Sequence, residues 1–383
     1  MIFYIGTWEK DKDPAKLMVF SAEGGGNRCI QTLTLPGNFS TLKLDAEKNR
    51  LYVLTNRDPD IQEGCGGVLN VYAVQPEGTV ELVQKTSSYG AEPIDLAVWK
   101  DRIALVNHGS TTNRVCRTER QADGRLKPIW VYDEASLILL ERLENGNAGG
   151  LLDQYRFAGQ GDVPFFQESA APHSIFYSAR GELLLVPERG SDRLSLFSVR
   201  SGRLELVGQL PEKKRCGPRN AAMTRDGRHI YMADEIVPSI THYAGPEWRA
   251  VSRVPTVSGE KAEACAGDPR SFAAPHPVAL WLSQDERQVY SLTRSTETLS
   301  VFSRDDRTGE LTMRQEWVLS GANPRQAMAD GNRVYVVLMD AQKLVELVLD
   351  PGQGLVLRER TLLDGIARIA AVDAMKRRSD DCG

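Results

Sequence analysis

The stretch Asp226-Gly227-Arg228-His229-Ile230-Tyr231 places a tight polar turn directly before an apolar segment, and related stretches recur along the chain. Asp-Gly and its relatives supply the positive φ angles that a β-hairpin turn requires. The clearest further copies are Asp285-Glu286-Arg287-Gln288-Val289-Tyr290 and Asp330-Gly331-Asn332-Arg333-Val334-Tyr335, and weaker copies begin at Glu47, Lys100 and Arg180. A repeat of about 40 to 50 residues is typical of propellers and solenoids.

Each of these turns lies between two short apolar segments, and two more segments of strand character follow. The third segment is clear in Leu194–Phe197, and the fourth follows a glycine turn in Arg203–Val207. Four antiparallel strands in each repeat form one propeller blade. A β/α solenoid would need amphipathic helices between its strands, and only Glu134–Leu143 has a helical pattern. The repeat therefore predicts an all-β propeller with four antiparallel strands per blade.

The number of copies predicts seven blades. Six complete copies begin near residues 39, 93, 174, 218, 277 and 323. Three strands near residues 2–6, 16–21 and 28–35 precede them, and the single strand Ile366–Val372 follows them. Strands from both termini therefore complete a seventh blade, which closes the ring and removes free sheet edges.

We expect residues 1–383 to form a single propeller domain with two connections longer than the repeat requires. These long loops cover about residues 132–172 and 257–276. Loops of more than about 15 residues are uncommon unless they are functional. Both lead into first strands of blades, so both are expected on the same face of the ring.

Composition and charge are those of an ordinary globular protein, with 41% apolar residues, 26% charged residues and a net charge of −4. The absence of a long basic run disfavours a nucleic-acid partner. No stretch reaches the roughly 18 apolar residues of a membrane helix, and the first apolar run is too short for a signal peptide. We therefore expect a soluble, cytoplasmic protein. Nothing in the sequence indicates an oligomeric state.

The six cysteines are scattered, with no C-x-x-C pair and no zinc-like spacing to histidine. This pattern favours free thiols over a disulfide framework. No group of histidines and carboxylates shares matching positions in the repeat, so we expect neither a metal site nor a cofactor.

Polar residues at equivalent places in the repeat are the candidate catalytic groups. They fall at the starts of first strands or the ends of second strands, which meet at one face of a blade, so they should converge at one mouth of the central channel. The candidate catalytic residues are His173, Arg219, Glu235 and Arg294, and the candidate substrate-binding residues are Asn107, Asn220 and Gln326. A histidine and a carboxylate can transfer protons, while guanidinium groups can hold an anion and stabilise an oxyanion.

The other histidines are predicted to be structural. His108 and His276 are assigned a structural role rather than a catalytic one, and His229 and His242 are expected at blade surfaces.

The order of these motifs resembles that of the lactonase propellers. The matching stretches are Ala171-Pro172-His173-Ser174, Val186-Pro187, Asp192-Arg193, Gly217-Pro218-Arg219, Glu235, Arg294 and the opening Tyr4-Ile5-Gly6-Thr7. That family includes propeller-type 6-phosphogluconolactonase and 3-carboxy-cis,cis-muconate lactonizing enzyme. The resemblance implies a small anionic lactone as substrate and an active site of His173, Arg219, Glu235 and Arg294. Two departures are Asn220, where the family commonly has histidine, and the apolar run Val278-Ala279-Leu280-Trp281.

Three functions remain open at this point. The first is hydrolysis of an anionic sugar lactone, in which Glu235 or His173 activates water. The second is a lactonizing cycloisomerase, in which the same residue moves a proton at the carbon next to a carboxylate. The third is a catalytically silent propeller that serves as a binding platform, in which Glu235 and Arg294 form a structural ion pair.

Overall fold

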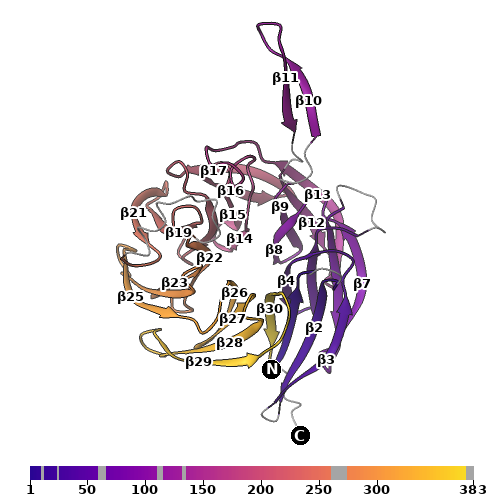
Figure 1. Ribbon diagram of the computed structural model, residues 1–383, viewed down its shortest axis with the longest axis vertical. Helices are drawn as coiled ribbons and strands as arrows, with labels where there is room; N and C mark the ends of the chain where they lie inside the picture. Colours follow the sequence, from indigo (N-terminus) through magenta and orange to yellow (C-terminus); the bar gives the residue numbers. More distant parts are fainter. Residues whose placement is uncertain are drawn as a thin grey trace.

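The computed structural model describes residues 1–9, 13–23, 26–58, 66–109, 115–131, 135–259 and 274–376. Seven four-stranded antiparallel sheets form a ring, and a further two-stranded sheet projects from it (Figure 1). Apart from one 3-10 turn at Arg180–Glu182, the described residues form no helix. The described part of the chain therefore has no helix that is long and apolar enough to span a membrane. The seven-bladed all-β propeller predicted from the repeat is confirmed.

The strands of blades 1 to 3 follow one another in sequence, numbered here from the first complete repeat. Blade 1 contains β4 (Phe39–Asp45), β5 (Arg50–Thr55), β6 (Val68–Val74) and β7 (Val80–Ser87). Blade 2 contains β8 (Pro93–Trp99), β9 (Arg102–Asn107), β12 (Ser136–Arg142) and β13 (Ala148–Arg156). Blade 3 contains β14 (Phe176–Ser178), β15 (Leu183–Glu188), β16 (Arg193–Arg200) and β17 (Arg203–Pro211).

Blades 4 to 6 repeat the same order. Blade 4 contains β18 (Pro218–Met223), β19 (His229–Asp234), β20 (Ser239–Ala244) and β21 (Arg249–Pro255). Blade 5 contains β22 (His276–Leu282), β23 (Gln288–Arg294), β24 (Thr298–Arg304) and β25 (Leu311–Val318). Blade 6 contains β26 (Pro324–Asp330), β27 (Arg333–Leu338), β28 (Lys343–Leu349) and β29 (Val356–Leu363). The first strand of each blade lies innermost in the ring (Figure 1).

Blade 7 closes the ring with strands from both ends of the chain. It consists of β30 (Ile369–Met375), β1 (Ile2–Thr7), β2 (Lys16–Glu23) and β3 (Gly26–Thr34). β1 and β30 pair antiparallel from Ile2 with Met375 to Gly6 with Ala371. This confirms the closure by both termini, although the last strand begins at Ile369, three residues later than expected.

Apolar side chains pack between neighbouring blades, and tyrosines fix their spacing. Tyr231 on β19 is fully buried, and its hydroxyl donates a hydrogen bond of 2.6 Å to the carbonyl of Gly309 in the β24–β25 turn of the next blade. Three more tyrosines make the same contact across other blade boundaries: Tyr4 with Gly78, Tyr52 with Gly146 and Tyr290 with Gly354. Each glycine has a positive φ angle, which suits the turn that presents its carbonyl.

The expectation of one long loop over residues 132–172 is wrong, because β12 and β13 lie within it. The helical pattern over Glu134–Leu143 is wrong for the same reason. Leu137 to Leu140 are all fully buried, because one face of β12 packs against blade 1 and the other against blade 3. A short continuous apolar run cannot distinguish such a strand from a helix. The actual long connection covers residues 157–175.

The two-stranded sheet is an insertion in blade 2. β10 (Val115–Arg120) and β11 (Leu126–Val131) lie between β9 and β12 and project away from the ring (Figure 1). In the second expected long loop, residues 257–276, positions 260–273 lie outside the described residues.

Candidate active site

A recurring β-bulge turns one residue of the first strand out of the regular alternation. In blades 1, 2, 4, 5, 6 and 7 the pairing of the first and second strands skips one residue near the start of the first strand. The skipped residues are Ser40, Ile94, Arg219, Val278, Arg325 and Ala370. A bulge redirects a side chain in this way without disrupting the rest of the sheet.

In blade 3 the place that corresponds to the bulge is occupied by His173. The isolated bridge between Pro172 and Glu188 sits where the other blades begin to pair, and His173 follows it. Two arginines and one histidine therefore share one position in the repeat.

A second set of polar residues stands where the second strands end. His108, Arg189 and Glu235 directly follow β9, β15 and β19, and Arg294 is the last residue of β23. Because antiparallel partners start and end at the same edge, both sets lie on the same face of the ring. We call this face the site mouth.

Glu235 lies at the centre of this group. Its Oε1 accepts hydrogen bonds from Arg219 Nη1 at 2.9 Å and Arg294 Nη2 at 3.2 Å, and its Oε2 accepts one from Arg189 Nη1 at 3.1 Å. Only 1% of the Glu235 side chain is exposed. Burial alone would raise the pKa of Glu235, but the neighbouring guanidinium groups, led by Arg219 and Arg189, hold that pKa well below its ordinary value.

The positive charge at the site mouth exceeds the charge of Glu235. Arg325 interacts electrostatically with Arg219, Arg294 and Glu235, and its guanidinium lies over the ring of Trp8 at 4.5 Å. Burial, followed by repulsion from other arginines, lowers the pKa of Arg325 to about 9 and that of Arg294 to about 10. We call Arg189, Arg219, Arg294 and Arg325 the arginine cluster. Three buried guanidinium groups and the half-buried Arg325 around one carboxylate favour the binding of an anion.

Two histidines complete the group. His173 Nε2 lies 2.6 Å from Arg219 Nη1, and His108 Nε2 lies 3.0 Å from Arg189 Nη2. Arginine can only donate, so each Nε2 accepts and is unprotonated. Burial, and then Arg189, lower the pKa of His108 to about 3, and burial with Arg219 lowers the pKa of His173 well below 6.5. Both imidazoles are therefore neutral at physiological pH.

Asp192 orders the loop that leads to Arg219. Its Oδ1 accepts hydrogen bonds from the backbone amides of Cys216 and Gly217 at 3.0 and 2.8 Å, and its Oδ2 accepts one from Arg215 N at 2.7 Å. Gly217 has a positive φ of 66°, and its carbonyl accepts the amide of Glu235 at 2.7 Å. One carboxylate thus sets the backbone that holds both Arg219 and Glu235.

The structure brings His173, Arg219, Glu235 and Arg294 together, as the repeat positions indicated. It does not bring Asn107 or Gln326 to them. Asn107 donates to Ser88 O and Ser136 Oγ, and Gln326 Oε1 accepts the amide of Val372. Asn220 lies one residue beyond the bulge, and its buried Oδ1 has no hydrogen-bond partner among the described residues.

Sequence reasoning missed Arg189 and Arg325 and assigned His108 to the structure alone. Arg325 and His108 directly adjoin the chosen residues Gln326 and Asn107. The bulge shifts the inward-facing position by one residue, so aligning each repeat on Pro-Arg would have found Arg325. His276 is buried, and its Nδ1 lies 2.9 Å from Glu235 O, in line with the expected structural role.

His229 and His242 are buried rather than at a blade surface, which corrects the expectation for them. Their side chains form a hydrogen bond of 2.9 Å between Nδ1 of His229 and Nε2 of His242, and the His242 ring stacks on Tyr231 at 4.9 Å.

A group with metal-ligating side chains lies close to the site among the described residues. Possible ligand atoms of Glu212, Cys216 and Asp234 lie within 4.8 Å of one another. The guanidinium of Arg253 donates to Cys216 Sγ at 2.9 Å and also bonds to Glu212. An arginine therefore supplies the positive charge that this group requires. Cys216 and Cys29 are both free thiols.

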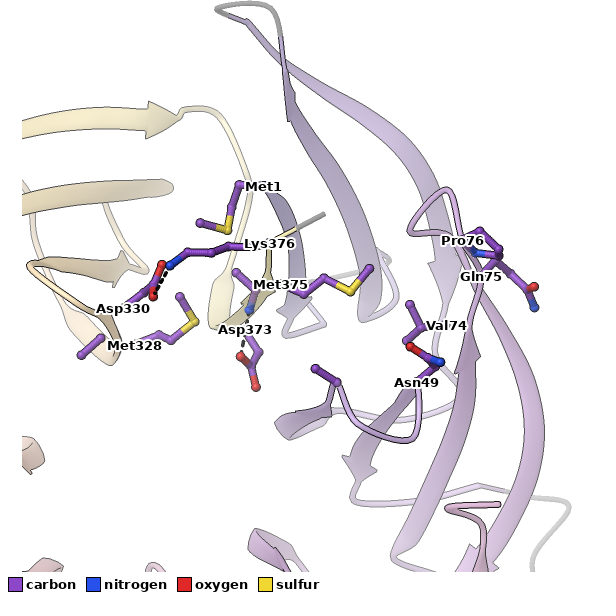
Figure 2. Close-up of a pocket in the computed structure, with 13 residues that line it drawn as sticks. Met1, Asn49, Val74, Gln75, Pro76, Met328, Asp330, Asp373, Met375 and Lys376 are labelled. Carbon is purple, nitrogen blue, oxygen red and sulfur yellow. Dashed lines mark hydrogen bonds and ion pairs between the residues drawn. The ribbon is translucent and has the colours of Figure 1, made fainter. Parts of the chain in front are cut away.

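A cavity of about 680 Å³ lies at the opposite mouth of the ring. It is lined by the ends of first strands, such as Met328 to Asp330 on β26 and Asp373 to Met375 on β30, and Asp330 pairs with Lys376 at 2.9 Å (Figure 2). It adjoins β30 and β1, which no hairpin turn connects. None of the site residues lines it, because they stand at the starts of first strands or the ends of second strands, at the other face of the ring.

Comparison with known proteins agrees with this architecture. A 6-phosphogluconolactonase of Erwinia tasmaniensis is 24% identical over 285 residues, which cover 73% of this chain and 70% of that protein. A 6-phosphogluconolactonase of Formosa agariphila is 25% identical over 131 residues, which span only 37% of its length. The periplasmic gluconolactonase of Pseudomonas aeruginosa has the same fold, with a TM-score of 0.75 and 17% identity over 97% of this chain and 98% of that one. The family model described as lactonase, 7-bladed β-propeller, matches residues 2–363. The chain therefore belongs to the lactonase family of seven-bladed β-propellers.

Proposed function

We propose that this protein hydrolyses a small sugar lactone that carries an anionic group, and that it does so at the site mouth. The observation that carries the proposal is the arginine cluster, in which three buried guanidinium groups bond to Glu235 and Arg325 adds a fourth positive charge, beside two neutral histidines. Membership of the lactonase family supports the reaction type, and the relatives named 6-phosphogluconolactonase support a phosphorylated sugar lactone as the substrate.

In this proposal the arginine cluster binds the substrate. Arg294 and Arg325, on neighbouring blades, hold the anionic group, because a guanidinium offers paired donors that match a phosphate or carboxylate. Arg219 is shared between Glu235 and His173. It turns toward the lactone carbonyl and stabilises the oxyanion that develops there.

His173 is the proposed general base. Once Arg219 engages the substrate, Nε2 of His173 is free to accept a proton from water. The water oxygen bonds to the carbonyl carbon, and the tetrahedral oxyanion forms. The bond between that carbon and the ring oxygen then breaks, and the imidazolium returns its proton to the leaving oxygen. The product is an open-chain hydroxy acid.

Glu235 has a positioning role in this scheme. Both oxygens of this carboxylate accept hydrogen bonds from arginines, and these bonds disfavour proton transfer from water to Glu235. Its negative charge instead offsets the repulsion among Arg189, Arg219 and Arg294 and orients their guanidinium groups toward the substrate.

A lactone panel tests the proposal. In a pH-stat assay we expect acid release from 6-phosphoglucono-δ-lactone, and less efficiently from glucono-δ-lactone. His173→Asn should lower kcat by about 10² to 10⁴, as the loss of a general base does. Arg249 is exposed on β21, so Arg249→Ala is the control and should retain full activity. Turnover of a carboxymuconolactone in place of both sugar lactones would favour a lactonizing cycloisomerase. No turnover of any of these would favour a binding platform.

A cytoplasmic location stays a prediction, since one solved protein with this fold is named as periplasmic.

A further inference from the structure

Phe165 is held in an unusual backbone conformation in the connection 157–175. Its φ angle is 71°, and 52% of the residue is exposed. For a bulky side chain this left-handed region is sterically strained, and such strain persists only where the surroundings enforce it.

Two other aromatic residues with positive φ angles are stabilised by their surroundings. Tyr89 (φ 55°) packs against the core between blades 1 and 2, and Trp248 (φ 45°) donates its Nε1 hydrogen to Gly227 O at 2.9 Å. Phe165 meets the ring of Phe166 at 5.4 Å between centroids, but it belongs to none of the buried apolar clusters of the described residues. Packing of Phe165 itself therefore does not explain its conformation.

The residues that follow Phe165 are anchored to the site. The Phe166 ring is buried. The Arg189 guanidinium lies 5.1 Å from the centre of this ring, and the His276 ring stacks on it with 5.7 Å between centroids. Because Arg189 bonds to Glu235, Phe165 is only one aromatic ring removed from the arginine cluster.

Gln167 fixes the other side of this turn. Its Nε2 donates to Arg189 O at 3.0 Å and to Asp192 Oδ1 at 2.8 Å, and its Oε1 accepts the amide of Val163 at 3.1 Å. These contacts tie Val163 and Gln167, on either side of Phe165, to each other and to the segment of Arg189 and Asp192. The anchored turn thus holds an exposed phenyl ring against Phe166, whose ring in turn contacts the buried Arg189 guanidinium.

We propose that Phe165 is a substrate-contacting residue whose ring packs against the C–H face of the ring of the bound molecule, while the arginine cluster holds its anionic group. This rests on the proposed function for the site, and it adds the residue that recognises the ring. An aromatic face fits a saturated ring well, because its C–H bonds carry partial positive charge.

Calorimetric titration with two non-hydrolysable probes tests the contact. Cyclohexyl phosphate carries a saturated ring and a phosphate, and inorganic phosphate carries the anion alone. We expect wild type to bind cyclohexyl phosphate about tenfold more tightly than inorganic phosphate. Phe165→Gly and Phe165→Ala should remove that preference and leave the affinity for inorganic phosphate unchanged. Leu357→Ala, at a residue that is 59% exposed on β29, is the matched control and should behave as wild type.

Stability provides the second measurement. Phe165→Gly should unfold at the same denaturant concentration as wild type or at a higher one, because glycine adopts the left-handed region without strain. A lower midpoint together with an unchanged preference for the ring would show a structural role and overturn the proposal. Loss of both probes together, or wild type without a preference for the ring, would overturn it as well. Probe binding without lactone turnover would contradict the hydrolytic function alone and leave the ring contact standing.

Discussion

Glu235 neutralises part of the positive charge of the arginine cluster, and this affects both the stability of the protein and its binding of anions. It is buried, and three arginines donate to it. Removal of one partner of a buried ion pair leaves uncompensated charge, which is strongly unfavourable. The site therefore depends on Glu235 whenever no anionic ligand is bound.

We expect Glu235→Gln to lower the free energy of unfolding by about 3 to 5 kcal/mol, because the arginines lose their counter-charge. Added phosphate should stabilise this variant more than wild type, since a bound anion replaces the lost carboxylate. Urea unfolding with and without phosphate measures both effects. Glu247→Gln, in an exposed pair with Arg249, is the control and should change little. A variant as stable as wild type in the absence of phosphate would contradict this account of Glu235.

The buried pair His229 and His242 predicts acid sensitivity. Burial, followed by repulsion from His229 and Arg304, lowers the pKa of His242 to about 4, from an ordinary value of 6.5. The unfolded chain therefore binds this proton more readily than the folded protein. The contribution of His242 to stability is complete above pH 6.5 and is lost progressively as the pH falls below it.

His242→Gln should consequently reduce the loss of stability between about pH 7.5 and about pH 5. The comparison is the difference between urea unfolding free energies at the two pH values, so an overall change in stability does not obscure it. An unchanged difference would mean that this pair does not contribute to the acid sensitivity.

At the scale of the strand, the bulge decides which side chains enter the site. Arg219 and Arg325 occupy it in blades 4 and 6. The sequence identifies four of the site residues because strand starts and ends are readable from the turns. It missed Arg325 and favoured Gln326, because a shift of one residue at a bulge changes the face to which each side chain belongs.

The strands could be predicted where tight turns separate them in the sequence. The prediction failed where such turns are missing. The six complete repeats begin within about two residues of the observed first strands. Blade 2 differs because β10 and β11 are inserted between its second and third strands, which displaces β12 from its expected place. Phe166 and Gln167 act through contacts between separate segments of the chain, and no local sequence pattern indicates them.

The tyrosine of the second strand should contribute to stability through its hydroxyl. Tyr231→Phe leaves the buried carbonyl of Gly309 without this donor, so we expect a loss of about 1 to 2 kcal/mol. Thermal or urea unfolding measures the change. Tyr177→Phe is the control, since this tyrosine is partly exposed and stacks on Trp99. Equal small effects for both substitutions would show that the bond between blades adds little.

For the whole molecule, closure of blade 7 holds the ring together. β30 supplies the innermost strand of this blade and also contacts β4 and β26 of the neighbouring blades. Deletion of residues 369–383 should expose the edge of β1 and the apolar faces of blades 1 and 6, and give an aggregated or loosely folded protein. Deletion of residues 377–383 alone, which keeps all of β30, is the control and should leave solubility and Tm unchanged. Equal solubility and Tm for the two truncations would contradict closure by β30.

The ratio of kcat/KM for 6-phosphoglucono-δ-lactone to that for glucono-δ-lactone, compared between wild type and Arg294→Ala, tests most directly whether the arginine cluster recognises an anionic lactone. We expect Arg294→Ala to lower this ratio about 10- to 100-fold, because charge-assisted hydrogen bonds to the phosphate disappear while the rest of the substrate is bound as before. Arg249→Ala should keep the wild-type ratio. An equal loss for both lactones, or no loss for either, would contradict the assignment of the cluster to the anionic group.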